Sequence, residues 1–258
     1  MAKFAANLTM LFNEVPFLER FEQAHRAGFK AIEFLFPYAF EPQLLAAKLE
    51  QYGFEQALFN MPPGDWDAGE KGFAALPGRE QEFKQSVATA LMYAKALNCK
   101  KVHAMSGIIN PAYSMKQHIE TFIANIRYAA DTFAEHGIDV LIEPLNTRDV
   151  PNYFVAHQRR AVELIQMVDR PNVKLQLDLY HAQIMDGDLD VLIRDLAPFT
   201  GHIQIASVPH RNEPAGGEIN YPYLFDVLDD SGYDGWIGCE YKPKTTTEQG
   251  LAWVKPYL

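Results

Sequence analysis

The feature that most constrains the fold is an alternation of short β-rich segments with longer amphipathic segments, repeated eight times along the chain. The candidate strands are Phe4–Leu8, Ala31–Phe36, Gln56–Asn60, Lys101–Met105, Val140–Leu145, Val173–Leu179, His202–Ala206 and Trp236–Glu240. Apolar residues recur with helical spacing between them, first at Phe17, Phe21 and Ala24 before a stop at Gly28, then near 42–52, 80–97, 115–136, 158–168, 188–196, 221–230 and 246–254. This strict alternation predicts an α/β protein built as a single (β/α)8 TIM barrel.

The competing α/β architecture is a doubly wound open sheet, which usually carries a glycine-rich phosphate-binding turn after its first strand. No such turn follows Phe4–Leu8. The length of 258 residues also suits one barrel, for which about 250 residues is typical. Composition does not change across the two longer irregular stretches, 61–79 and 207–220. We therefore expect one domain over residues 1–258.

Charge and cysteine content narrow the class of partner. The chain carries 33 acidic and 23 basic residues, a formal net charge of -10, which disfavours binding to nucleic acid because that binding relies on Lys and Arg. Cys99 and Cys239 form no CxxC pattern, which favours a reduced, cytoplasmic setting. Neither a signal peptide nor a run of about 18 apolar residues is present, so we expect no membrane partner. A homo-oligomer is compatible with all of this.

Oxygen-bearing side chains stand at the ends of the last four candidate strands. In a barrel, alternate strand residues point inward, and functional groups gather at the carboxyl ends of the strands. Glu143 and Glu240 each end an apolar strand, and Asp178 and Gln204 have the inward phase of the two strands between them. We therefore expect these four side chains to converge at one mouth of the barrel.

Each of these residues alone could be a solvated or paired polar group at a strand end. Together, several unpaired carboxylates in a low-dielectric interior would repel one another and would have raised pKa values. A divalent cation removes that conflict, and three carboxylates with one amide oxygen form a hard ligand set that suits Mg²⁺ or Mn²⁺. The sequence thus favours a metal site over a metal-free polar cluster.

Glu143 and Glu240 belong to strands that face each other across the predicted mouth. Each could accept a proton on one side of a bound substrate. With a cation polarising a carbonyl between them, the arrangement suits removal of a proton from the carbon next to that carbonyl. The predicted chemistry is enolisation.

Three further residues are candidates for substrate binding. His181 lies where the strand that ends near Asp178 passes into the next loop, and it is either catalytic or structural. Arg211 follows the seventh strand and is either a surface arginine paired with Glu213 or a fork that grips a carboxylate or hydroxyls. His103 has inward phase and is either a substrate contact or a core histidine.

Two polar residues in the early strands can support the site from behind. Glu33 has the inward phase of the second strand, and Asn60 ends the third. Other signatures are missing: the sequence has no GxSxG elbow, no P-loop and no HExxH. Nucleophile-elbow hydrolases, P-loop NTPases and zincins therefore lose their main support.

Seven short motifs lie along the chain, and they are Ala5-Ala6-Asn7-Leu8, Glu33-Phe34-Leu35-Phe36-Pro37-Tyr38, Gly64-Asp65-Trp66, Pro77-Gly78-Arg79-Glu80, Ile142-Glu143-Pro144, Gly217-Glu218-Ile219-Asn220-Tyr221 and Gly238-Cys239-Glu240-Tyr241-Lys242-Pro243. They resemble the hydroxypyruvate isomerase family, within the xylose isomerase-like barrels. The resemblance runs essentially from end to end, and the last two motifs are specific. Members of that family interconvert hydroxypyruvate and tartronate semialdehyde, or 2-oxotetronate and 3-oxotetronate.

The resemblance implies that Glu143 and Glu240 are the acid/base pair, and that these two residues hold the cation together with Asp178 and Gln204. Related ketose 3-epimerases usually place a histidine where Gln204 stands, which favours the isomerase branch. The stretch from Phe4 through Phe17 is more similar to the 2-oxotetronate isomerases. By contrast, Gly64-Asp65-Trp66 and Glu143-Pro144-Leu145-Asn146 are more similar to hydroxypyruvate isomerase, so the length of the substrate stays open.

The resulting hypothesis is a metal-assisted, aldose–ketose-type isomerase of a small 2-oxo acid that works through an enediolate. One alternative is a ketose 3-epimerase on the same scaffold, which would change configuration without moving the carbonyl. Another is a sugar-acid-binding barrel without turnover. A barrel endonuclease for damaged DNA would need a His-rich multinuclear zinc site and a basic surface, and the sequence has neither.

Overall fold

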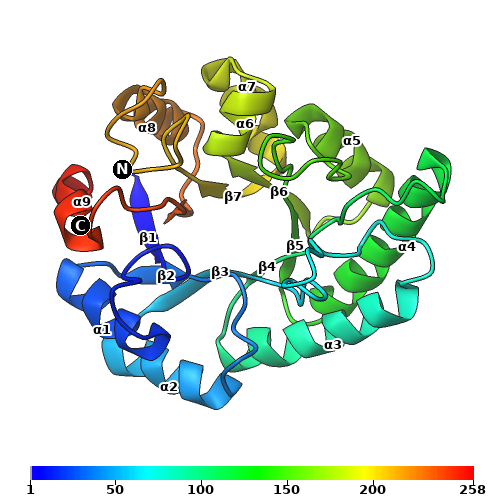
Figure 1. The fold of residues 1–258 in the computed structure, drawn as a ribbon, viewed down its shortest axis with the longest axis horizontal. Coiled ribbons are helices and arrows are strands. Elements are labelled where there is room, and N and C mark those ends of the chain that lie inside the picture. Colours follow the sequence, from blue (N-terminus) through cyan, green and yellow to red (C-terminus); the bar gives the residue numbers. More distant parts are fainter. Residues whose placement is uncertain (1) are drawn as a thin grey trace.

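A computed structural model describes residues 2–258 and contains a closed barrel of eight parallel strands (Figure 1). The strands follow one another around the barrel in chain order: β1 (Lys3–Asn7), β2 (Ala31–Glu33), β3 (Glu55–Asn60), β4 (Lys101–His103), β5 (Asp139–Ile142), β6 (Val173–Asp178), β7 (Thr200–Gln204) and β8 (Trp236–Cys239). The sheet closes where β1 pairs with β8, with Lys3 opposite Trp236. The predicted (β/α)8 barrel is confirmed.

Helices surround the ring of strands on its outer side (Figure 1). They are α1 (Phe17–Ala27), α2 (Pro42–Tyr52), α3 (Glu80–Ala96), α4 (Met115–Ala134), α5 (Gln158–Val168), α6 (Leu179–Met185), α7 (Leu189–Leu196), α8 (Tyr221–Asp230) and α9 (Thr247–Gly250). Helix α1 ends as its spacing predicted, because Gly28 takes a left-handed conformation with φ of 102° that residues with a Cβ rarely adopt. Among residues 2–258, no helix combines the length and the apolar character needed to cross a membrane.

The observed elements differ from the predicted ones in several places, among them α6, β2 and α9. Helix α6 begins directly after β6, because the Asp178 side chain accepts the backbone N–H of Tyr180 and caps the new helix. The strand predicted as Val173–Leu179 therefore ends one residue earlier, and a helix follows where a loop was expected. Strand β2 ends at Glu33, three residues before its predicted end. The helix predicted over 246–254 is the short α9 followed by a turn of 3-10 helix.

The apolar core and the polar residues of the barrel lie on opposite faces of the strands. Phe4 of β1 points outward and packs edge-on against Phe225 of α8 and against Trp253, with ring centroids 5.1 and 5.3 Å apart. Glu33 of β2 points inward, because its carboxylate reaches the side chain of Gln204 on β7, a strand that is not its neighbour. The sheet thus holds the helices with one face and offers a polar interior with the other.

Candidate active site

Four buried polar side chains lie at the carboxyl end of the barrel. Asp178 and Gln204 are the last residues of β6 and β7, and the strand register sets them opposite each other. Glu143 and Glu240 each follow their strand, β5 and β8, by one residue. The exposed fraction of each of the four residues is 5% or less. Because all strands run in the same direction, the four residues share one end of the barrel.

Arg211 places a positive charge between two of the carboxylates. Its Nη2 lies 3.3 Å from Glu240 Oε1 and 3.5 Å from Asp178 Oδ2, and its guanidinium group lies over the ring of Tyr180 at 4.9 Å from the centroid. Glu213, the alternative surface partner, instead accepts the backbone N–H of Lys244. The geometry therefore corresponds to the functional interpretation of this arginine.

The backbone at Arg211 explains the inward direction of its side chain. The residue has a left-handed conformation with φ of 56°. Its N–H donates to the carbonyl of Ser207 at 2.8 Å, and its carbonyl accepts the N–H of Lys242 at 2.7 Å. Hydrogen bonds on both sides hold a backbone conformation that costs free energy for a residue other than glycine.

The carboxyl groups at this end have raised pKa values. Burial raises the pKa of Glu143 well above its usual range, and the charges of Glu240 and Asp178 add to that effect. Burial raises the pKa of Glu240 to about 8 and that of Asp178 to about 6, while Arg211 lowers both. For Arg211 itself, burial lowers the pKa but the surrounding carboxylates raise it further, so it stays cationic. One cation therefore stands among three acidic groups whose ionised forms are costly.

Two histidines line the same cluster. His103 is fully buried, its Nδ1 lies 3.4 Å from Glu143 Oε2, and burial lowers its pKa to about 3. His181 Nε2 lies 3.6 Å from Asp178 Oδ2 and 3.9 Å from Glu143 Oε1. Burial and the charge of Arg211 lower the pKa of His181 well below its usual value. Both imidazoles are therefore neutral at pH 7.

A second layer of polar groups lies beneath the carboxylates. The Glu33 carboxylate accepts hydrogen bonds from Asn7 Nδ2 at 2.9 Å and Gln204 Nε2 at 2.8 Å, and it contacts His202 Nε2 at 2.7 Å. Gln204 Oε1 also accepts a hydrogen bond from Gln176 Nε2. Glu33 therefore supports Gln204 from behind, as its inward phase suggested. Asn60 ends β3 with its Oδ1 buried, without a hydrogen-bond partner among the residues that the structure describes.

Sequence reasoning missed Asn146 and Asp149, which belong to the loop after β5. Asn146 donates to His181 Nδ1 through both its backbone N–H, at 3.0 Å, and its side-chain Nδ2, at 2.7 Å. Asp149 Oδ2 accepts from Asn146 Nδ2 and from the Tyr180 hydroxyl. The sequence did contain a sign of this turn, because Asn146 stands three residues before Asp149. At that spacing the Asn side chain can accept the backbone N–H of the later residue.

The donor set fits a divalent cation. A carboxylate oxygen of Glu143 and one of Asp178 lie within 4.8 Å of each other, and a ring nitrogen of His181 lies within the same distance of both. Within residues 2–258, Asp178 Oδ2 is a buried carboxylate oxygen without a hydrogen-bond partner. A divalent ion would stabilise the ionised forms of the three carboxyl groups and would satisfy that oxygen.

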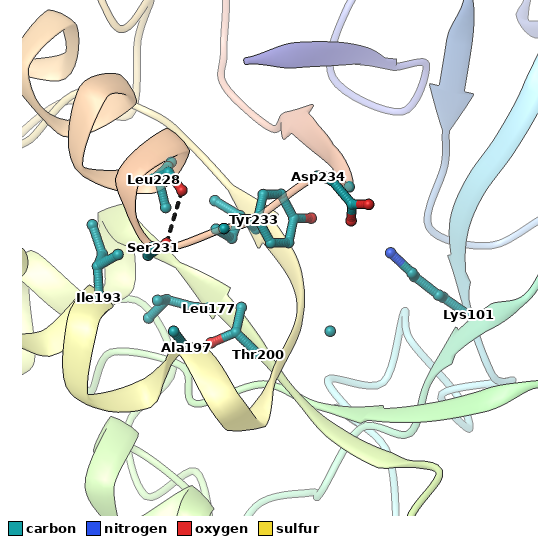
Figure 2. A pocket seen from close by; sticks show the side chains of 13 residues that line it. Lys101, Leu177, Ile193, Ala197, Thr200, Leu228, Ser231, Tyr233 and Asp234 are labelled. Carbon is teal, nitrogen blue, oxygen red and sulfur yellow. Dashed lines mark hydrogen bonds between the residues drawn. The ribbon is translucent and has the colours of Figure 1, made fainter. Parts of the chain in front are cut away.

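A separate cavity of about 180 Å³ lies at the opposite, amino end of the barrel. It is lined by residues that include Lys101, which begins β4, and Thr200, which begins β7. Figure 2 shows the amino group of Lys101 pointing toward the carboxylate of Asp234 across this region. None of the four strand-end residues lines the cavity. The cavity therefore lies apart from the candidate site.

Comparison with known proteins supports the same assignment of fold and adds an activity. The family model of the xylose isomerase-like TIM barrel matches residues 21–257. A 2-oxo-tetronate isomerase of Pectobacterium atrosepticum is 52% identical over 258 residues, covering all of this chain and 98% of that protein. A hydroxypyruvate isomerase of Escherichia coli is 48% identical over 257 residues, covering 100% of both chains.

Solved structures agree on the fold. The crystal structure of an AP endonuclease, family 2, from Brucella melitensis is 60% identical, with a TM-score of 0.98 over 100% of this chain and 99% of that one. A 3-keto-D-glucoside 4-epimerase from E. coli has a TM-score of 0.82 at 19% identity, covering 99% of both chains. The second likeness extends to the fold alone.

Proposed function

This chain belongs to the xylose isomerase-like TIM barrel family and is an isomerase, and we propose that it interconverts 2-oxotetronate and 3-oxotetronate through an enediolate. The three-carbon pair, hydroxypyruvate and tartronate semialdehyde, is the second candidate. Three relatives at 49–52% identity carry the four-carbon name. A relative at 48% carries the three-carbon name, and four at 43–46% carry it as a putative one, so the order of similarity supports the four-carbon pair.

The observation that carries the proposal is the pair of buried glutamates on β5 and β8. Their raised pKa values make each a carboxyl group that can hold a proton near neutral pH. One of Glu143 and Glu240 removes the proton from C3, the hydroxyl-bearing carbon, and leaves an enediolate. Delivery of a proton to C2 and transfer of the hydroxyl proton from O3 to O2 complete the product. Carbon and hydrogen balance without an external oxidant.

A divalent cation, Mg²⁺ or Mn²⁺, is part of the proposal. Glu143, Asp178, Gln204 and Glu240 would hold it, because all four present oxygen atoms at the same end of the barrel. When bound, it supplies a positive charge that polarises the substrate carbonyl and offsets the ligand carboxylates. Asp178 Oδ2 is buried without a hydrogen-bond partner among the described residues, and this supports the assignment.

The remaining residues bind and orient the substrate. Arg211 presents a guanidinium group that can pair with the substrate carboxylate, and His181 presents Nε2 toward Glu143 and Asp178. His103 is fully buried next to Glu143. We therefore assign it the role of supporting that glutamate, in preference to direct contact with the substrate.

An endonuclease activity, suggested by the name of the Brucella relative, has less support in this chain. A net charge of -10 would repel a phosphate backbone. The proposed ligands are three carboxylates and an amide, with His103 and His181 beside Glu143, whereas hydrolysis at several zinc ions would need more imidazole ligands. The epimerase alternative keeps the same two glutamates, and product analysis separates it from the isomerase.

A substrate panel tests the proposal. Purified protein is assayed with 2-oxotetronate, hydroxypyruvate and free ketoses, in Mg²⁺, Mn²⁺ or a chelator, with DNA that contains an abasic site as the hydrolytic control. We expect the carbonyl to move from C2 to C3, turnover to stop in the chelator and to return with added cation. In D2O, deuterium should enter at C2. A product with inverted configuration and an unmoved carbonyl would establish an epimerase instead.

A further inference from the structure

The contacts of His181 determine which of its ring nitrogens carries the proton. Nδ1 faces two N–H groups of Asn146: the backbone N–H at 3.0 Å and the side-chain Nδ2 at 2.7 Å. A proton on Nδ1 would point at both donors. Nδ1 is therefore an acceptor, and the single proton of the neutral ring is on Nε2.

This assignment depends on the orientation of the Asn146 amide, and Asp149 fixes that orientation. Asn146 Oδ1 accepts the backbone N–H of Asp149 at 2.8 Å, and Asn146 Nδ2 donates to Asp149 Oδ2 at 3.1 Å. Exchanging the oxygen and nitrogen of the amide would set an oxygen against a carboxylate and an NH2 group against an N–H. The Tyr180 hydroxyl donates to the same carboxylate oxygen at 2.9 Å and holds it in place.

The other ring nitrogen points into the candidate site. Nε2 of His181 is buried and lacks a hydrogen-bond partner within residues 2–258, although it lies close to Asp178 and Glu143. A protonated Nε2 has no lone pair to give a cation. Proximity to two carboxylates therefore does not make His181 a ligand, and its N–H stays available to an oxygen atom of a bound molecule.

We propose that Asn146 and Asp149 are positioning residues that hold His181 as its Nε2–H tautomer, so that it donates a hydrogen bond to a substrate oxygen and does not bind the cation. The identity of that oxygen rests on the proposed function, because isomerisation of a 2-oxo acid builds negative charge on the oxygens of C2 and C3. A fixed neutral donor stabilises this charge without giving up its proton.

The first test observes the tautomer without any substrate. The full chain is prepared with 15N-labelled histidine, and long-range 1H–15N spectra are recorded with and without Mg²⁺; the signal that disappears in His181→Gln identifies the residue. We expect a pyridine-type Nδ1 and a pyrrole-type Nε2 in both conditions. A proton on Nδ1, or loss of the Nε2 proton when Mg²⁺ is added, would overturn the proposal. Because no turnover is needed, this result is independent of the outcome of the substrate panel.

The second test replaces the side-chain donor that faces Nδ1. Asn146→Asp places a carboxylate oxygen there, which competes with the remaining backbone N–H for Nδ1. We expect Nδ1 to become protonated and kcat to fall about 10- to 100-fold, as when a metal-ligating histidine loses its outer hydrogen-bond partner. Asn110→Asp is the matched control: Asn110 is an exposed loop residue whose Oδ1 accepts the N–H of Ala112, a role that a carboxylate can also fill. It should keep both the tautomer and kcat of the parent.

Asn146→Ala covers the case in which the charged variant folds poorly. It keeps the backbone donor to His181 Nδ1 and loses only the side-chain donor. We expect the Nε2–H form to persist, with a smaller loss of kcat than in Asn146→Asp. Equal losses in both variants with an unchanged tautomer would show that Asn146 only shapes the loop, and would overturn its role as a positioning residue.

Discussion

The two ends of the barrel differ in how deeply their acidic groups are buried. At the carboxyl end, Glu143, Asp178 and Glu240 are buried around one half-buried cation, Arg211, and all three carboxyl groups have raised pKa values. At the amino end, burial lowers the pKa of Lys101, but the negative charges of Asp139, Glu55 and Asp234 oppose that effect. The acids of the carboxyl end are thus buried, whereas at the amino end Glu55 and Asp234 are exposed and Asp139 is half-buried.

The difference shows where the fold tolerates a cost in stability. Both ends are made by the same eight strands, so the scaffold itself does not demand the unfavourable arrangement. Strained or poorly compensated groups persist where function requires them. We attribute the buried acids of the carboxyl end to the proposed cation and substrate, and each of the following measurements tests whether the two ends differ in that way.

The largest effect should come from removing one carboxylate of the carboxyl end. For Glu143→Gln and Glu240→Gln we expect kcat to fall by about 10²- to 10⁴-fold, because each variant lacks a group that transfers the proton. The metal-free free energy of unfolding should be unchanged or higher, since a costly buried acid is gone. Steady-state kinetics with Mg²⁺ and urea unfolding in chelator measure the two quantities.

The control for this experiment is Glu120→Gln, on the exposed outer face of α4. It should match the parent in both measurements. If a folded Glu143→Gln or Glu240→Gln protein kept near-normal turnover, the two glutamates would not be the acid/base pair. A marked fall in the metal-free free energy of unfolding of either variant would contradict the view that these buried carboxyl groups destabilise the folded protein.

A steric change beneath the site should give the next effect. A Cβ at position 238 would lie 2.3 Å from both carboxylate oxygens of Glu33, the residue that supports Gln204. For Gly238→Ala we expect a loss of about 1–3 kcal/mol in the free energy of unfolding, together with weaker binding of Mg²⁺. Urea unfolding and Mg²⁺ titration check this. Gly216→Ala, where a Cβ meets nothing within 4 Å, should leave both values unchanged.

The pH dependence of metal-free stability gives a third test. Burial raises the pKa of Glu240 from 4.5, the ordinary value that applies to the unfolded chain, to about 8 in the folded protein. Between these values the folded state retains a proton that the unfolded state has lost. The free energy of unfolding should therefore fall as pH rises through that window. Urea unfolding in chelator at several pH values measures the slope. Mg²⁺ should stabilise the protein more at the upper end of the window, and Glu240→Gln should flatten the slope; a rise of stability with pH would contradict the assignment.

The smallest effect should come from the amino end. Lys101→Met removes the cation near Asp139 and Asp234, for which we expect a loss of about 1 kcal/mol in the free energy of unfolding. Turnover should stay within about twofold of the parent, because the group lies at the far end of the barrel and its field is screened by solvent. Thermal or urea unfolding and steady-state kinetics measure these values. A loss of turnover as large as that of the glutamate variants would show that the two ends are not independent.

Most of the fold followed from the sequence because every strand and almost every helix has its own apolar periodicity. The exception is α6, whose seven residues depend on a cap from Asp178 and follow the strand without a loop. Short helices of that kind are set by one hydrogen bond and by packing, and neither leaves a periodic pattern.

The candidate site was predictable to the extent that it lies on strands. The inward phase of Asp178 and Gln204 and the terminal positions of Glu143 and Glu240 are properties of spacing. Asn146 lies in a loop, and its contact with His181 joins that loop to helix α6, two segments that only the closed barrel brings together. The direction of Arg211 depends on a left-handed backbone that hydrogen bonds from two other segments impose, which the local sequence does not reveal.

The pairing of β1 with β8 has a consequence for the chain as it is being made. Since synthesis runs from the amino end, β1 keeps an unpaired edge until β8 has emerged, and contacts so distant along the chain form slowly. Glu240 follows β8 and Arg211 lies shortly before it, so the catalytic mouth gains its second glutamate only when the edge is covered. A nascent or truncated chain would expose a strand edge that invites aggregation and would lack one of the two proposed acid/base groups.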